Sequence, residues 1–339
     1  WLGALSCSLL FFFTGPNLVF GIAVFILASI GFSGSLVFYN AYLPEIAAPH
    51  EQDRLSARGF SMGYIGSVIL LSFNLWMVLQ PGTFGIAEGS SLPARTAFLS
   101  VGLWWFGFSL IPFAYLPTNF YQKPQRKSLI FQGFRELAGV WRSLQEQPFL
   151  RGFLGAFFLY SVGLQTVMYL APTFGAKTIG LSSGELTLSI LIIQLVAIGG
   201  AMLFARLSGI IGNIGTLIVM ILIWIGVCIS AYFVYDATGF YVLAFGVGLV
   251  MGGVQSLSRS TYSKFLPDTQ DHASYFSFYD ITEKVSIVIG TLGYGLIEEL
   301  TGSMRNSVML LVGFFIGGVI LLIRLSYLDR KALAGRFRS

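Results

Sequence analysis

Long apolar stretches separated by short polar segments make up most of the chain. A membrane-spanning helix needs about 20 predominantly apolar residues, and ten segments of roughly this kind follow one another. They lie near residues 1–13, 18–43, 58–80, 97–116, 150–172, 185–207, 214–234, 239–264, 275–297 and 306–326. No soluble domain of enzyme size remains between them, so the pattern predicts an all-α membrane protein.

The longest polar interval covers residues 117–149, with four predicted spans before it and six after it. Apolar residues recur within it at spacings of three and four, which predicts one stripe on a helix. The stripe consists of Phe134, Leu137, Trp141 and Leu144. Arg135 and Arg142 lie on another face, so we expect the helix on the cytoplasmic membrane surface, near anionic headgroups. A calmodulin-target-like helix is the competing interpretation.

A seven-residue motif occurs at residues 39–45 and again, loosely, at 262–268. Each copy ends an apolar segment and precedes a short charged loop with one histidine, His50 or His272. Because both copies occupy the same place in the order of spans, they predict two parallel repeats, as in many secondary transporters. Six spans in each repeat would give twelve, and we expect this chain to contain the third to the twelfth.

These observations predict four regions. They are an N-terminal bundle at 1–116 that lacks its first two spans, a cytoplasmic linker with the amphipathic helix at 117–149, a C-terminal six-helix bundle at 150–327, and a cytoplasmic basic tail at 328–339.

The composition supports a membrane location and explains the basic charge. Charged residues are 10% of the chain and hydrophobic residues 55%, whereas roughly 25% of an ordinary soluble domain is charged. The net charge is +5, but if residue 1 faces the cytoplasm, sixteen Lys and Arg residues lie on that side and only Arg95, Lys177 and Arg305 on the other. This distribution follows the positive-inside rule. The charge therefore indicates topology, with both ends of the chain cytoplasmic, and does not indicate a nucleic-acid partner.

Sequence patterns for catalysis are absent. The chain has no P-loop, and its only histidines lie 222 residues apart. Cys7 and Cys228 both fall in apolar spans, where they suit neither a disulfide framework nor a metal site. The sequence therefore predicts no enzyme, no cofactor and no metal.

Four charged residues fall close together in two predicted spans of the second half: Arg259, Asp280, Glu283 and Lys284. Charge at this depth is costly and usually faces a cavity or a partner. Asp280 and Lys284 are four residues apart and can pair on one helix face. The four predict a charge-compensated cluster in which a carboxylate could carry a coupling proton. The alternative is that Arg259 and Lys284 only extend to the headgroups.

Two amides, Gln165 and Gln255, lie near the centres of predicted spans. Amides offer donors and acceptors without the cost of a charge, so they suit a cavity that binds a polar solute. Hydrogen bonding between helices is the alternative role, and both remain open.

Several segments carry a family resemblance. They are residues 39–46, 53–59, 252–260, 275–279 with Lys284, and 301–303 with Arg305. They resemble the vacuole-effluxer-like major facilitators, which include the autophagy-related amino-acid effluxers of fungal vacuoles and their bacterial relatives. The resemblance implies the major facilitator fold, in which two pseudo-symmetric six-helix bundles surround a central cavity. It also implies transport by alternating access, with amino-acid efflux as the best-known activity.

The resemblance further implies a cytoplasmic gate around the repeated motif. The candidate residues are Tyr39, Asn40, Pro44, Glu45, Asp53, Arg54, Arg58, Arg206, Pro267 and Asp268. The loop at 206–213 keeps Arg206 but lacks the acidic residue usual in such gates, and Thr291 follows Gly290 where the family often has Pro.

We therefore expect a monomeric secondary transporter in a bacterial inner (plasma) membrane. Its partners would be lipid, a small polar solute and a coupling proton or ion. The alternative is a non-transporting receptor or assembly partner that retains the fold, which the altered loop at 208–213 favours.

Overall fold

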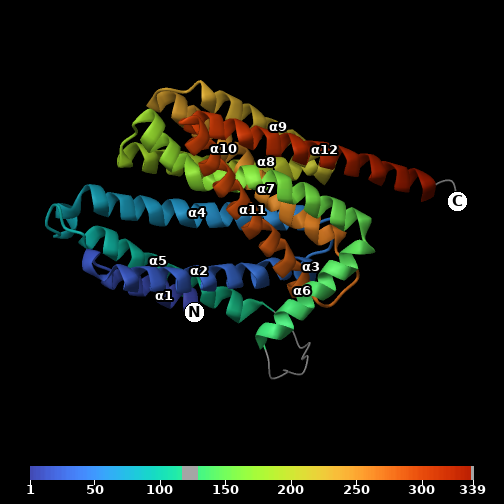
Figure 1. Ribbon diagram of the computed structural model, residues 1–339. Coiled ribbons are helices and arrows are strands. Elements are labelled where there is room, and N and C mark those ends of the chain that lie inside the picture. Colours follow the sequence, from blue (N-terminus) through green and yellow to red (C-terminus); the bar gives the residue numbers. More distant parts are fainter. Residues whose placement is uncertain (117–128, 337–339) are drawn as a thin grey trace. The chain divides into compact units, whose positions relative to one another are not determined.

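The computed structural model describes residues 1–116 and 129–336, with side-chain environments for 1–116 and 133–328 (Figure 1). The long apolar stretches form helices, because backbone groups in lipid must be satisfied within the segment. The helices are α1 (Leu2–Leu9), α2 (Leu18–Ala41), α3 (Leu43–Ile46), α4 (Gln52–Leu79), α5 (Leu92–Tyr115), α6 (Leu129–Gln145), α7 (Pro148–Phe174), α8 (Ser183–Ile211), α9 (Asn213–Tyr232), α10 (Ala237–Phe265), α11 (His272–Thr301) and α12 (Met304–Arg336).

Each of the ten predicted spans coincides with a helix. Eight helices of the described chain are long and apolar enough to cross a membrane. The helical segment Leu2–Phe12 is apolar but shorter than the others. Helix α11 has 30 residues but carries Asp280, Glu283, Lys284 and two further carboxylates. The all-helical membrane architecture is therefore confirmed, while the total of twelve spans stays a prediction.

The described chain forms two compact units, and two helices are divided between them. One unit contains residues 1–39 and 66–129, and the other contains residues 40–65 and 130–339. The boundary of the units thus falls within α2 and α4, and the predicted bundle boundaries stay predictions. Residues 123–127 of the basic linker, and all but the first residue of the predicted tail, lie outside the described side chains.

In the first unit, α1 packs closely against α5. Gly3 faces the ring of Trp105, and Gly102 of α5 faces Ala4 and Ser8 of α1. Small residues at these positions let the two helices approach closely, as is usual in membranes.

The second unit has a well-packed core of large side chains. Tyr160, Tyr262 and Phe276 are almost completely buried. Trp224 of α9 stacks on Phe315 of α12, with ring centroids 5.7 Å apart. These side chains come from α7, α9, α10, α11 and α12, so the core includes helices from the start to the end of the second half of the sequence.

Glycines allow α8 and α10 to pack at backbone distance within this unit. Gly248 of α10 faces the carbonyl oxygen of Ile193, Gly252 faces that of Ala197, and Gly200 of α8 faces that of Leu249. A side chain at any of these positions would separate the helices.

Gly200→Ala should therefore lower the free energy of unfolding by about 1–3 kcal/mol, because the added methyl group would overlap the carbonyl oxygen of Leu249. Gly199→Ala is the matched control, since open space surrounds Gly199. There, the better helix propensity of Ala should leave stability equal or higher. Thermal unfolding in detergent measures both, and equal melting temperatures for the two variants would contradict the close packing.

Candidate functional site

A buried carboxylate, Asp53, joins the start of α4 to the second half of the chain. It accepts hydrogen bonds from Ser208 Oγ at 3.1 Å, Asn213 Nδ2 at 2.8 Å and Lys264 Nζ at 2.7 Å. Asp53 lies in the first turn of α4, where the helix dipole favours negative charge. Its partners come from the C-terminal end of α8, the start of α9 and the C-terminal end of α10.

Asn213 completes this network. Its amide nitrogen also donates to Thr261 Oγ1 at 3.0 Å, and its amide oxygen accepts from Lys264 Nζ at 3.2 Å. The loop at 206–213 has no acidic residue of its own. Asp53, 160 residues earlier in the sequence, supplies one through space. We call Asp53, Ser208, Asn213, Thr261 and Lys264 the Asp53 cluster.

A second polar contact joins the first copy of the repeated motif to the start of α11. Glu45 of the short helix α3 approaches His272 at the start of α11, with Oε1 and Nδ1 3.4 Å apart. Pro44 is in the first turn of α3 and begins it with a fixed backbone angle. The first copy of the motif is thus linked to the loop that follows the second copy.

The other predicted gate residues are less buried. Arg54, Arg58, Arg206 and Asp268 are exposed, and Pro267 is half-buried. Tyr39 belongs to the first unit, at the end of its segment 1–39, and is 47% exposed. The structure therefore brings Asn40, Glu45 and Asp53 into contact with the second half of the chain, and leaves all three predicted basic gate residues at the surface.

Arg259 is a buried cation on α10, with 4% of its surface exposed. Its Nε donates to Ser56 Oγ at 2.9 Å, Nη2 to the carbonyl oxygen of Ser56 at 3.2 Å, and Nη1 to Asn40 Oδ1 at 3.3 Å. The guanidinium carbon lies 4.8 Å from the ring centre of Phe60. Hydrogen bonds and a cation–π contact together offset part of the cost of burying this charge.

Gln255 lies one turn from Arg259 on the same helix. Its Oε1 accepts a 2.6 Å hydrogen bond from the Tyr64 hydroxyl, and its Nε2 approaches Met168 Sδ of α7 at 3.6 Å. Gln165 is buried on α7, with 7% exposed. The amide of Gln255 thus connects α4, α7 and α10.

The sequence analysis missed Ser56 and Tyr64. Together with Phe60 they recur every four residues, which places them on one face of α4. That face meets Gln255 and Arg259, which have the same spacing on α10. A search for matching polar stripes on two helices could have found this contact.

Lys284 of α11 pairs with two carboxylates of the same helix. Lys284 Nζ lies 3.6 Å from Asp280 Oδ1 and 4.0 Å from Glu283 Oε1. The predicted pairing of Asp280 with Lys284 is present. Arg259, expected in the same cluster, makes hydrogen bonds with Asn40 and Ser56, and its place in the α11 cluster stays a prediction.

Helix α6 packs against the start of α11. Val140 and Leu144 are buried, and the Ser143 and Tyr275 hydroxyls are 2.9 Å apart. Phe134 and Trp141 are 70% and 59% exposed. The amphipathic helix is thus present, with Leu144 of the predicted stripe buried against the protein and Phe134 and Trp141 exposed, and its position on the membrane surface stays a prediction.

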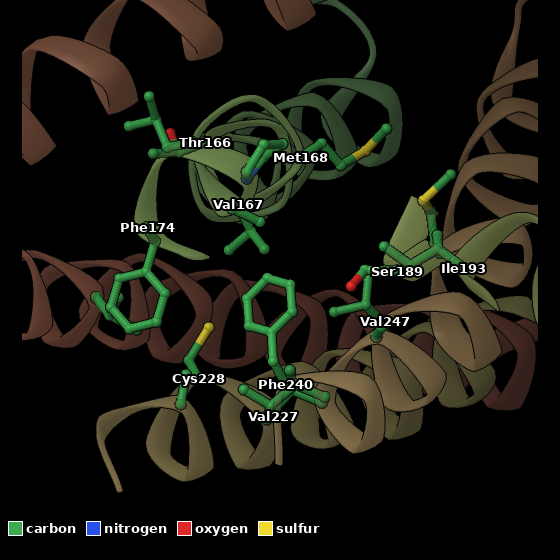
Figure 2. Close-up of a pocket in the computed structure, with 18 of the residues that line it drawn as sticks. Thr166, Val167, Met168, Phe174, Ser189, Ile193, Val227, Cys228, Phe240 and Val247 are labelled. Carbon is green, nitrogen blue, oxygen red and sulfur yellow. The ribbon is translucent and has the colours of Figure 1, made fainter. Parts of the chain in front are cut away.

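The second unit also contains a partly open apolar pocket of about 260 Å³. It is lined by side chains from α7 to α12, including Val167, Val227 and Phe240 (Figure 2). In the part of the chain that the structure describes, no group of three or more His, Cys, Asp or Glu residues could hold a metal ion.

Comparisons with known proteins agree with this architecture. A family model described as "Vacuole effluxer Atg22 like" matches residues 1–333. The MFS-type transporter YxiO of Bacillus subtilis is 28% identical over 321 residues, which cover 94% of this chain and 74% of YxiO. Autophagy-related protein 22 of Yarrowia lipolytica is 25% identical over 76% of this chain and 48% of its own length. The chain thus spans about half the length of that fungal relative.

Solved transporter structures share the fold. The Escherichia coli fucose:proton symporter FucP aligns with a TM-score of 0.66 at 15% identity, over 96% of this chain and 81% of FucP. The human organic anion transporter MFSD10 aligns with a TM-score of 0.69 at 16% identity, over 95% of this chain and 75% of its own. These likenesses concern the fold alone.

Proposed function

We propose a transport mechanism from the premise that this chain belongs to the vacuole effluxer Atg22-like family of major facilitator superfamily (MFS) transporters. The protein moves a small polar solute across a bacterial inner (plasma) membrane by alternating access, and amino-acid efflux is the activity we favour. Both ends of the chain face the cytoplasm in this proposal, in accordance with the distribution of Lys and Arg.

The observation that carries the proposal is a polar set that consists of the buried Arg259 and Tyr64 and the half-buried Gln255. A buried cation in a membrane protein usually serves a substrate or ion pathway. Arg259 attracts an acidic group of the solute, while Gln255 and Gln165 supply neutral donors and acceptors. Asn40 and Ser56 hold the guanidinium in place through hydrogen bonds.

In this mechanism the Asp53 cluster is the cytoplasmic gate. Its hydrogen bonds close the ends of α4, α8, α9 and α10 against one another. The pair of Glu45 and His272 adds a second closure. Opening requires these polar contacts to break, and a solute that stabilises the open arrangement promotes the change.

Coupling to an ion is assigned to α11. Lys284 pairs with both Asp280 and Glu283, which leaves this set of three with one net negative charge, so binding of a proton to either carboxylate would change its pairing with Lys284. That change could bias the helix between two arrangements.

Neutralising Asp280 tests the transport proposal. Asp280→Asn in purified protein reconstituted in liposomes should reduce flux of a responsive amino acid at least tenfold without changing membrane insertion. Glu88→Gln is the control, because Glu88 is exposed and outside the α11 set. Normal flux in both Asp280→Asn and Lys284→Met would remove these residues from the mechanism.

The same liposomes distinguish the receptor alternative, since a receptor binds solute without moving it. The reason for that alternative was the missing acidic group in the loop at 208–213. Because Asp53 contacts Ser208 and Asn213, this reason is weakened, and we favour transport.

A further inference from the structure

Tyr279 of α11 lies in an aromatic cluster that holds its ring in place. Phe157 of α7 stacks on the ring, with centroids 4.2 Å apart, and the ring of Tyr262 of α10 lies 4.9 Å away. Phe276, three residues earlier on α11, lies at 6.2 Å. Only 5% of Tyr279 is exposed. Because α7, α10 and α11 all contribute to this packing, they fix the direction in which the side chain points.

The hydroxyl groups of this cluster differ in whether they are paired. The hydroxyls of Tyr160 and Ser258 share a hydrogen bond of 2.7 Å, and Tyr262 donates to the carbonyl oxygen of Tyr275 at 2.7 Å. The Tyr279 hydroxyl makes no hydrogen bond with any described residue. It is also not one of the fully enclosed unpaired atoms, so its oxygen keeps accessible surface that a ligand can reach. A phenylalanine would satisfy the packing, and the hydroxyl is therefore available for a ligand.

A carboxylate is the charged group that acts most strongly on this hydroxyl. It belongs to Glu283, which lies one turn further along α11 and also acts on Tyr160. Among the described residues, no hydrogen bond joins Glu283 directly to Tyr279, so a third group can bridge the two. The side chain of Glu283 is 25% exposed, which leaves the carboxylate accessible as well.

The charges of α11 favour a cation at this position. Lys284 Nζ lies 3.6 Å from Asp280 but 4.0 Å from Glu283, so Glu283 is the more weakly paired of the two carboxylates. One lysine cannot neutralise both, and unbalanced charge within a predicted span is costly. A cationic group between Glu283 and Tyr279 would supply the missing positive charge. Carboxylate and hydroxyl oxygens both accept hydrogen bonds from an ammonium group.

We propose that Tyr279 and Glu283 form the subsite for a primary ammonium group of the solute. The ammonium donates to the carboxylate of Glu283 and to the hydroxyl oxygen of Tyr279, whereas Arg259 attracts the acidic group. This subsite rests on the proposed transport of a polar solute and assigns the contact that selects a free amino group. Asp280 keeps Lys284 as its partner, so solute recognition and proton coupling use different carboxylates.

Tyr279→Phe and Tyr262→Phe each remove one hydroxyl from the same aromatic cluster. Flux is measured in liposomes over a range of concentrations of an amino acid that the parent transports. Tyr279→Phe should raise KM roughly fivefold or more with less than about a twofold change in kcat, and should not lower the melting temperature, because the hydroxyl is unpaired. Tyr262→Phe should lower the melting temperature, since it loses the hydrogen bond to Tyr275, and should leave KM nearly unchanged. Glu283→Gln should raise KM as well.

The deaminated analogue of the same amino acid (propionate for alanine) separates the ammonium from the rest of the solute. In the parent it should compete roughly tenfold more weakly than the amino acid, and Tyr279→Phe should not weaken it further. An unchanged KM in Tyr279→Phe, a melting temperature lowered as in Tyr262→Phe, or equal competition by the analogue would overturn the subsite and leave transport intact. Absence of flux in the parent with every amino acid would overturn the proposed function and the subsite together.

Discussion

Arg259→Lys should lower the free energy of unfolding by about 3 kcal/mol even though the positive charge is kept. The guanidinium makes three hydrogen bonds in a fixed fork, two to Ser56 and one to Asn40. A lysine ammonium is a compact point charge and cannot reach all three acceptors at once. It also loses the flat contact with the ring of Phe60. Thermal or denaturant unfolding in detergent measures the effect.

Arg151→Lys is the matched control for this prediction. Arg151 is exposed, and surface substitutions away from special features usually change stability by less than about 0.5 kcal/mol. In liposomes we expect Arg259→Lys to lose most flux and Arg151→Lys to keep it. Unchanged stability of Arg259→Lys would mean that the hydrogen bonds to Asn40 and Ser56 contribute nothing.

Asp53→Asn should lower the free energy of unfolding by about 2–3 kcal/mol. The carboxylate accepts from three donors, whereas an asparagine keeps one acceptor oxygen and turns a donor toward Lys264 or Asn213. A double-mutant cycle with Lys264→Met isolates the pair, because neighbours in one network are not additive. We expect a coupling energy of about 1–2 kcal/mol.

Glu51→Gln is the control for the Asp53 prediction, since Glu51 is exposed two residues earlier. If the Asp53 cluster is a gate, Asp53→Asn should also change the labelling of a cysteine near the cluster, and a loss of stability alone does not predict this. A cysteine placed at the buried position Ser263 should react faster with a membrane-impermeant maleimide in Asp53→Asn than in the parent. An additive cycle and an unchanged labelling rate would show that the Asp53 cluster is no gate.

The order of the spans could be predicted from the sequence because lipid demands a long apolar segment for each crossing. The ends of the helices could not. The predicted span 58–80 begins at Gln52 in the structure, and the span 306–326 extends to Arg336. Polar residues at the membrane surface continue a helix without contributing to an apolar pattern, so hydropathy underestimates its length.

In the candidate site, contacts within one helix could be predicted from the sequence, whereas contacts between distant segments could not. The pairing of Asp280 with Lys284 follows from their spacing on one helix, and the structure contains it. The partners of Arg259 and Asp53 lie 155 to 219 residues away in the sequence, where one-dimensional spacing carries no information. The hydrogen bonds of Arg259 with Asn40 and Ser56 were not predicted, whereas its place beside the α11 charges stays a prediction.

The separation of 203 residues between Ser56 and Arg259 has a consequence during biosynthesis. At a translation rate of about 5–20 residues per second, the ribosome needs roughly 10–40 s to make α10 after it has made the start of α4. Throughout that interval the nascent chain holds Asn40, Asp53 and Ser56 without their later partners. The early segments of this protein therefore depend on the insertion machinery or on chaperones until the second half has been synthesised. A chain that ended before Arg259 would lack these partners permanently and would be degraded by proteases.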